Sequence, residues 1–169
     1  MSSKPSAAIN RKLFDGEANI AIKNPDTWEQ FVSDEMAINT PVNMEMELLE
    51  KNDTARTIKF RITLSYSAIA ADHNLGIALI ENKIIADQQD GIVHIEDYEH
   101  QHVLRKYISP IVGTPITTSL EANTVIIKEF EINLDDYDTN NIWQIENMAL
   151  ITFIRQPNNE IVNAQMLEW

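Results

Sequence analysis

The sequence predicts a mainly β protein: an antiparallel, immunoglobulin-like β-sandwich over residues 40–169, preceded by a hairpin and a helix within residues 1–39. Residues 42–48 and 58–66 alternate between apolar and polar side chains, which is typical of strands with one buried face. Turn signals recur about every ten residues, as they do in antiparallel sandwiches. No helical pattern alternates with strands after residue 40, and this argues against a parallel sheet with crossover helices.

The first residues indicate a small hairpin. Ser6–Phe14 and Ala18–Ile22 are short apolar segments that favour extended backbone, and Asp15-Gly16 between them is a strong turn signal. We therefore expect the two segments to pair.

A helix is predicted over residues 25–37. Asn24 is a good N-cap residue, and Pro25 suits the first helical position. Apolar residues then recur at helical spacing, namely Trp28, Phe31, Val32 and Met36. This stripe should pack beside the sandwich.

The remaining strands follow from runs of apolar residues. Residues 75–85 are apolar almost throughout, so they predict a central strand, whereas the acidic stretch 86–97 predicts a loop with a short extended piece at 92–95. Residues 109–119 mix Pro, Gly and Thr and predict an irregular loop. Three further strands are expected at residues 125–134, 145–155 and 160–167.

Composition excludes several classes of partner. The chain has 169 residues, 44% of them hydrophobic, which is enough for one packed domain. Its 13 basic and 26 acidic residues give a net charge of −13, which would repel nucleic acids and anionic lipids. Cysteine is absent, so disulfides and thiolate chemistry are excluded for this chain.

The sequence contains no membrane-spanning or signal segment. No apolar run reaches the about 18–20 residues that a transmembrane helix needs, and Met1–Ser6 lacks the apolar region of a signal peptide. Either the protein is cytoplasmic or its targeting segment lies outside this sequence.

The most unusual segment is Tyr98–Tyr107, which places two histidines, two tyrosines and two cations among strands of an acidic protein. On a continuous strand, even-numbered residues would share one face, and these are His94, Glu96, Tyr98, His100 and His102. Imidazoles two residues apart beside a carboxylate can bind zinc or nickel. No third ligand is fixed by spacing, however, and the alternative favoured here is that His100 and His102 hydrogen-bond to loop backbone.

Arg105 and its neighbours are expected to be structural. The guanidinium should pair with Glu99 or Asp97, or bond to carbonyls of the loop after it. Tyr98, His102 and Arg105 would then tie residues 86–119 onto the sandwich. Binding of an anionic partner by Arg105 is the alternative. Leu104 should point toward the core and Val103 away from it.

A second candidate metal site begins with Asp136, Asp138 and Asn140, which are spaced as in an EF-hand calcium loop. That pattern requires Gly at its sixth position and Glu at its last, where this sequence has Asn141 and Asn147. A solvated acidic turn is therefore the preferred interpretation, with a loose surface site for a divalent cation as the alternative.

Signals for catalysis are missing. No serine lies in a Gly-x-Ser-x-Gly context, and only four glycines are present, too few for a phosphate-binding loop. The sequence therefore predicts a non-catalytic protein without a cofactor.

Three segments resemble one known family. The Tyr98–Arg105 segment, with its His-x-His-Val-Leu-Arg core, is similar to a motif of the twenty-eight-kilodalton outer-membrane protein family of the Bacteroidetes. The final segment from Trp143 to Ala164 resembles the end of that family's C-terminal domain. The stretch Lys4–Arg11 resembles the point where its thioredoxin-like domain passes a proline and enters a strand.

This resemblance implies that residues 1–39 are the tail of a thioredoxin-like domain and residues 40–169 a β-sandwich domain. It also implies a non-catalytic binding or structural module of an exported envelope lipoprotein, in the periplasm or at the outer-membrane surface, whose partner is a protein or another envelope component. The alternatives are an accessory domain of a thiol–disulfide enzyme, a metal-binding domain, or a small complete protein whose helix covers one end of the sandwich.

Overall fold

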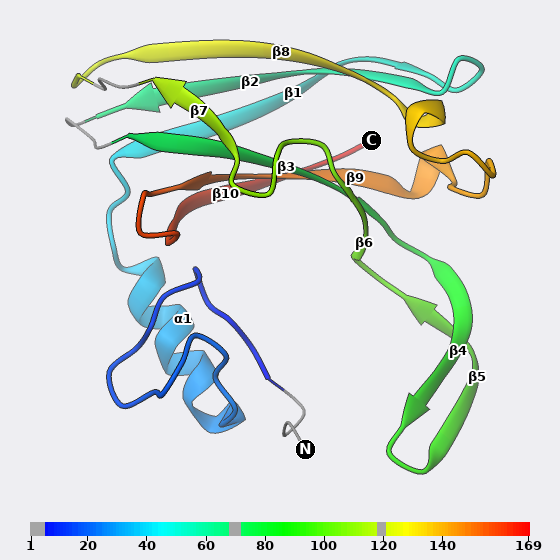
Figure 1. Cartoon of the computed structure of the whole chain (residues 1–169), viewed down its shortest axis with the longest axis horizontal. Coiled ribbons are helices and arrows are strands. Elements are labelled where there is room, and N and C mark those ends of the chain that lie inside the picture. Colours follow the sequence, from blue (N-terminus) through cyan, green and yellow to red (C-terminus); the bar gives the residue numbers. More distant parts are fainter. Residues whose placement is uncertain (1–5, 68–71, 118–120) are drawn as a thin grey trace.

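In a computed structural model, the described residues (6–67, 72–117 and 121–169) fold mainly as antiparallel strands in two facing sheets, with a helix and a long hairpin that project on the same side of the sheets from opposite ends (Figure 1). The prediction of a mainly β, antiparallel fold is confirmed. Expectations that concern residues 1–5, 118 and 119 lie outside the described residues.

The first sheet contains the two alternating segments that the sequence predicts. β1 (Val42–Asn52) and β2 (Thr57–Tyr66) form a hairpin, and β8 (Val125–Asn133) pairs with the other edge of β2. Every second residue of β2 is buried, as the alternation requires. On the solvent-exposed face, Arg61 forms ion pairs with Glu47 and Glu129, which link the three strands of this sheet.

The second sheet is organised around β3 (His73–Glu81), and the prediction of a central strand here is confirmed. β9 (Met148–Arg155) pairs along one edge of β3 and carries β10 (Ile161–Glu168) beyond it. Along the other edge lie β6 (Val103–Tyr107) and β7 (Thr114–Thr117). The predicted irregular loop therefore contains a short strand.

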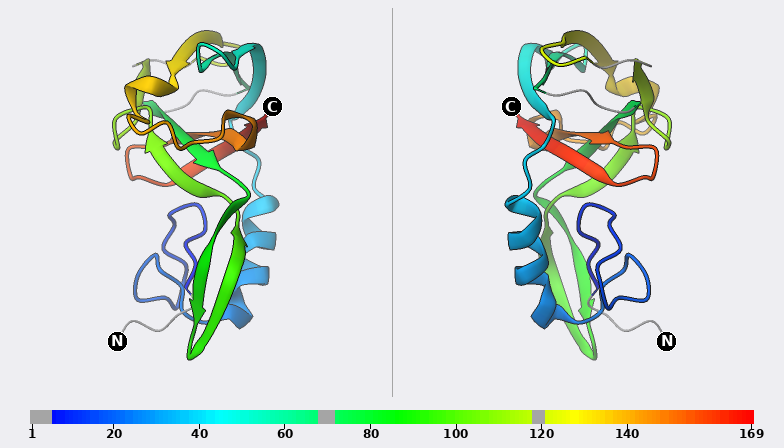
Figure 2. Two further views of the ribbon diagram at one scale, coloured as in Figure 1. Left: turned by 90° about the vertical axis from the view of Figure 1, so that its right-hand side faces the viewer. Right: turned by 90° about the vertical axis from the view of Figure 1, so that its left-hand side faces the viewer.

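The core lies between the two sheets, which stack as layers in the side views (Figure 2). Buried side chains come from both sheets, for example Phe60 from β2 and Leu79 from β3. Short 3-10 helices, η2 (Leu134–Asp136) and η3 (Ile145–Asn147), close one end and bury Leu134 and Ile145.

A long hairpin occupies the region where the sequence predicts a polar loop. β4 (Ile84–Asp90) and β5 (Val93–His100) pair only with each other, and residues 84–100 are hereafter called the arm. The loop prediction is wrong because Gly91, with φ of +61°, begins a two-residue hairpin turn of the kind that joins strands regardless of their polarity.

The N-terminal unit, residues 6–39, also differs from expectation. Its predicted hairpin is reduced to one bridge between Ala7 and Ile22. The predicted helix is present as η1 (Pro25–Thr27) followed by α1 (Trp28–Met36), with the Asn24 side chain accepting a hydrogen bond from the Asp26 amide.

The apolar stripe of α1 packs against its own unit rather than the sandwich. Phe31 stacks on Phe14 with ring centroids 4.2 Å apart, yet no residue of α1 is buried. Met36 is 82% exposed, and Val32 is also exposed.

Candidate functional site: the base of the arm

The histidine segment is divided among three elements. Tyr98 and His100 end β5, where their rings meet edge to face at 4.9 Å. His102 lies in the turn before β6, with φ of +54°, and its backbone amide donates to the Asn82 side chain over 2.8 Å. Arg105 lies within β6. The segment therefore bridges the arm and the sandwich.

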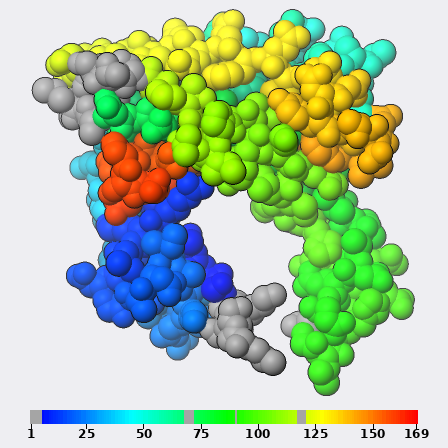
Figure 3. Space-filling view, viewed as in Figure 1, coloured from blue at the N-terminus to red at the C-terminus, as the bar shows by residue number. Residues whose placement is uncertain are grey.

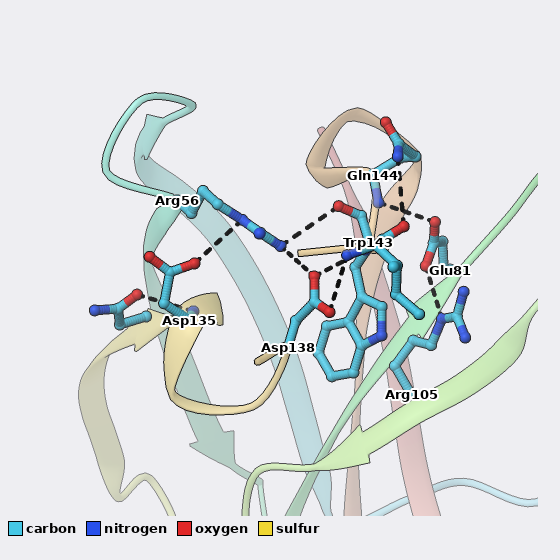
Figure 4. Close-up of polar contacts among 9 residues, drawn as sticks. Arg56, Glu81, Arg105, Asp135, Asp138, Trp143 and Gln144 are labelled. Carbon is cyan, nitrogen blue, oxygen red and sulfur yellow. Dashed lines mark hydrogen bonds and ion pairs between the residues drawn. The ribbon is translucent and has the colours of Figure 1, made fainter. Parts of the chain in front are cut away.

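Arg105 is fixed by a buried carboxylate on the neighbouring strand (Figure 4). Its Nε donates to Oε2 of Glu81 over 2.7 Å, and the other oxygen of Glu81 accepts from the Gln144 amide over 3.0 Å. Glu81 is only 2% exposed. The guanidinium also lies 5.9 Å from the centroid of the Trp143 ring.

A second buried pair lies on the other side of Trp143 (Figure 4). Asp138 accepts from Arg56 Nη2 over 2.6 Å and from the amides of Ile142 and Trp143. Burial opposes ionisation of this carboxyl, but the bonds from Arg56 and from the two amides outweigh it and hold the pKa of Asp138 below its usual value. Asp135 adds an ion pair to Arg56 at 3.4 Å.

We call this set of two pairs the polar knot; it comprises Arg56, Glu81, Arg105, Asp138, Trp143 and Gln144. Each oxygen of Glu81 and Asp138 already accepts at least one hydrogen bond. The hydrogen-bonding capacity of both carboxylates is therefore engaged within the protein. The knot thus joins the turn before β2 to β3, β6 and the loop before η3.

The structure does not bring the candidate metal ligands together. His94 faces Asp87 with 3.2 Å between Nε2 and Oδ2, and a bulge with Asp97 at φ of +53° breaks the alternation that would align His94 with His100. Asp138 is committed to Arg56, while Asp136 and Asn140 are exposed. Among residues 6–67, 72–117 and 121–169, no group of three potential ligands is close enough to hold an ion.

Two details of the sequence prediction for this segment are wrong. Arg105 pairs with Glu81 rather than Glu99 or Asp97, because β6 pairs with β3 and leaves those two acids on the arm. Leu104 is 50% exposed, whereas Val103 is half-buried, so the direction of alternation is the reverse of that expected.

Sequence reasoning also missed Glu81, Arg56 and Trp143 as members of the site. One signal was present: Glu81 is a lone acid inside the apolar run 75–85, and a carboxylate in such a position needs a buried cation or donor. Arg56, the cationic partner of Asp138, is remote from it in sequence, so spacing gave no indication of this pair.

The arm itself exposes apolar side chains. Among arm residues whose burial is described, none is buried, and Ile92 at the tip is 101% exposed. Ile85, Val93 and Tyr98 are exposed as well. Soluble proteins commonly expose single apolar residues, and several on one projecting hairpin make the arm a candidate contact surface.

A cavity of about 270 Å³ lies where the N-terminal unit meets the sandwich. Lys12 and Glu35 form a 2.6 Å ion pair in its wall, and Glu160 also lines it. The Ile161 amide donates to the Asn10 carbonyl over 2.9 Å, and Arg11 lies over the Phe153 ring. These contacts attach residues 6–39 to the second sheet.

The family model of outer membrane protein Omp28 matches residues 1–168. The chain belongs to this family. Its membership confirms the family resemblance of the histidine segment and the C-terminal hairpin, and it makes the chain a domain of a cell-envelope protein.

One solved structure shows the same fold. HBP35 of Porphyromonas gingivalis superposes with a TM-score of 0.76 at 18% identity, over 99% of this chain and 53% of that one. This chain thus spans about half of the HBP35 chain. A domain of the outer membrane lipoprotein Omp28 from Porphyromonas gingivalis matches with a TM-score of 0.48 at 12% identity, covering 78% of this chain and 89% of that one.

No curated protein matches the chain. Within the part of the chain that the structure describes, no helix combines the length and apolar character required to cross a bilayer.

Proposed function

We propose that this Omp28-family chain is a non-catalytic binding or structural module of an outer-membrane-associated lipoprotein, and that its arm is a surface for contact with another folded protein domain. The observation that carries the proposal is the contrast between the saturated carboxylates of the polar knot and the unburied side chains of the arm. A rigid base with an exposed hairpin suits contact rather than turnover. The module would be located in the periplasm or at the outer-membrane surface.

The proposal includes two points of architecture. The sandwich is immunoglobulin-like in outline, and residues 6–39 are the tail of a thioredoxin-like domain whose first part is encoded upstream. Support for the second point comes from the composition of the unit. Only Phe14 and Ile22 are buried within it, too few for 34 residues to fold alone.

The competing function is that of an accessory domain in a thiol–disulfide enzyme. We would assay reduction of insulin by the full-length polypeptide and by its Glu81→Gln and Asp138→Asn variants, with melting temperatures measured in parallel. The proposal expects lower melting temperatures and an unchanged turnover number below them. A turnover number that falls while the melting temperature is unchanged would show that the module takes part in catalysis.

A further inference from the structure

The N-terminal unit and the arm project on the same side of the sandwich, from its opposite ends, and leave an open hollow between them (Figures 1 and 3). Figure 3 shows this hollow between the segments coloured blue and green. Both elements expose apolar side chains. The arm exposes Ile92, Val93 and Tyr98, with Ile85 on the face opposite Tyr98, and the unit exposes Leu13, Ile20, Val32, Met36 and Ile38.

Neither flank is self-sufficient. A two-stranded hairpin is at best marginally stable in water when, among its described residues, it has no third strand beside it and no buried side chain. A nine-residue helix with no buried residue depends equally on outside contacts. Because both elements project on the same side, a single folded domain between them would bury apolar side chains of both.

A second copy of this chain is a poor occupant on electrostatic grounds. The arm contains no Lys or Arg and five acids, Asp87, Asp90, Glu96, Asp97 and Glu99. A chain with net charge −13 would meet this surface with like charge.

We propose that the occupant is a globular domain of the same polypeptide, the one that residues 6–39 complete, and that the arm clamps its far side. The inference rests on the proposed function, in which residues 6–39 belong to a larger domain. HBP35 supports it, because the superposition covers 99% of this chain, both flanks included, yet only 53% of the HBP35 chain. A polypeptide with this framework thus has almost as much chain again.

The position of Ile92 allows a direct test. Because its side chain is 101% exposed, an altered residue there disturbs no packing inside the module. We would introduce the photo-crosslinking residue p-benzoylphenylalanine at position 92 of the full-length protein, illuminate it, and map the adduct by mass spectrometry. The matched control is position 127, an isoleucine 60% exposed on β8, which lies on the opposite side of the sandwich from the arm.

The expected result is an intramolecular adduct between position 92 and residues encoded upstream of Met1. The control variant, with the crosslinker at position 127, should give no such adduct. An adduct to a second copy or to another protein, or none at position 92, would overturn the clamp while leaving the proposed function standing. A gene without upstream residues would overturn both. As a second readout, Ile92→Asp should speed amide exchange across residues 84–100 in the full-length protein, whereas Ile127→Asp should not.

Discussion

Two hairpins of this protein have the same antiparallel pairing but differ in their neighbours and their burial. The β1–β2 hairpin lies against a third strand and a facing sheet, and half of β2 is buried, whereas the β4–β5 hairpin has neither neighbour and no buried residue among those described. Both are antiparallel and joined by short turns. The difference teaches that strand pairing shapes the molecule, while burial between sheets supplies most of its stability.

The largest test of this comparison truncates one isoleucine in each hairpin. Ile62 in β2 is fully buried, so Ile62→Ala should lower the free energy of unfolding by about 2–5 kcal/mol. Ile85 in β4 is exposed, and Ile85→Ala in the isolated chain should change it by less than about 0.5 kcal/mol. Urea denaturation measures both values. Equal losses would contradict the contrast between the hairpins.

The polar knot provides the second test, where the arm joins the sandwich. Arg105→Met leaves the Glu81 carboxylate buried without its cation and should cost about 2–3 kcal/mol. The adjacent Lys106 is exposed, and Lys106→Met is the matched control, expected to cost less than about 1 kcal/mol. Chemical denaturation at neutral pH compares them. If the polar knot contributes nothing to stability, the two variants will have the same denaturation midpoint.

A third test uses pH, because the sandwich buries a histidine and the arm exposes one. Burial lowers the pKa of His73 below its ordinary 6.5, although nearby Asp72 opposes this. The folded state therefore holds His73 neutral where the unfolded state binds a proton. Its contribution is complete above pH 6.5 and is lost as the pH falls below that value.

His73→Gln should therefore flatten the stability profile measured by thermal melting below pH 6.5. The same profile is measured for His94→Gln, which replaces an exposed histidine of the arm. A profile that is unchanged in His73→Gln would show that this imidazole is not held neutral.

The smallest expected effect concerns metal binding at the end of the arm. Because the described residues contain no cluster of three ligands, zinc or nickel should leave the melting temperature unchanged, in the native chain and in His100→Ala. A large rise that His100→Ala abolishes would identify the end of β5 as a metal site and make the arm more than a contact surface.

Local patterns predicted the sandwich well and its appendages poorly. Strands such as β2 can be recognised from alternating apolar and polar residues, because one face is buried against a second sheet. The arm has no such face, so its acidic residues resembled a loop, and only Asp90-Gly91 marked its turn. Arg105 was identified as structural. Identifying its partner Glu81, however, requires knowing that β3 pairs with β6. Strand order is a long-range property that spacing does not encode.

The way in which the arm leaves the sandwich has a consequence for how this family diversifies. β3 and β6 are paired neighbours, with Glu81 opposite Val103, so residues 82–102 are topologically one long insertion between two strands of a hairpin. The Asn82 side chain joins the two ends of the insertion through the His102 amide. Each doubling of such a connection costs only about 0.6 kcal/mol in closure entropy. Descendants can therefore lengthen, shorten or exchange the arm, and so change what they touch, while inheriting the same sandwich.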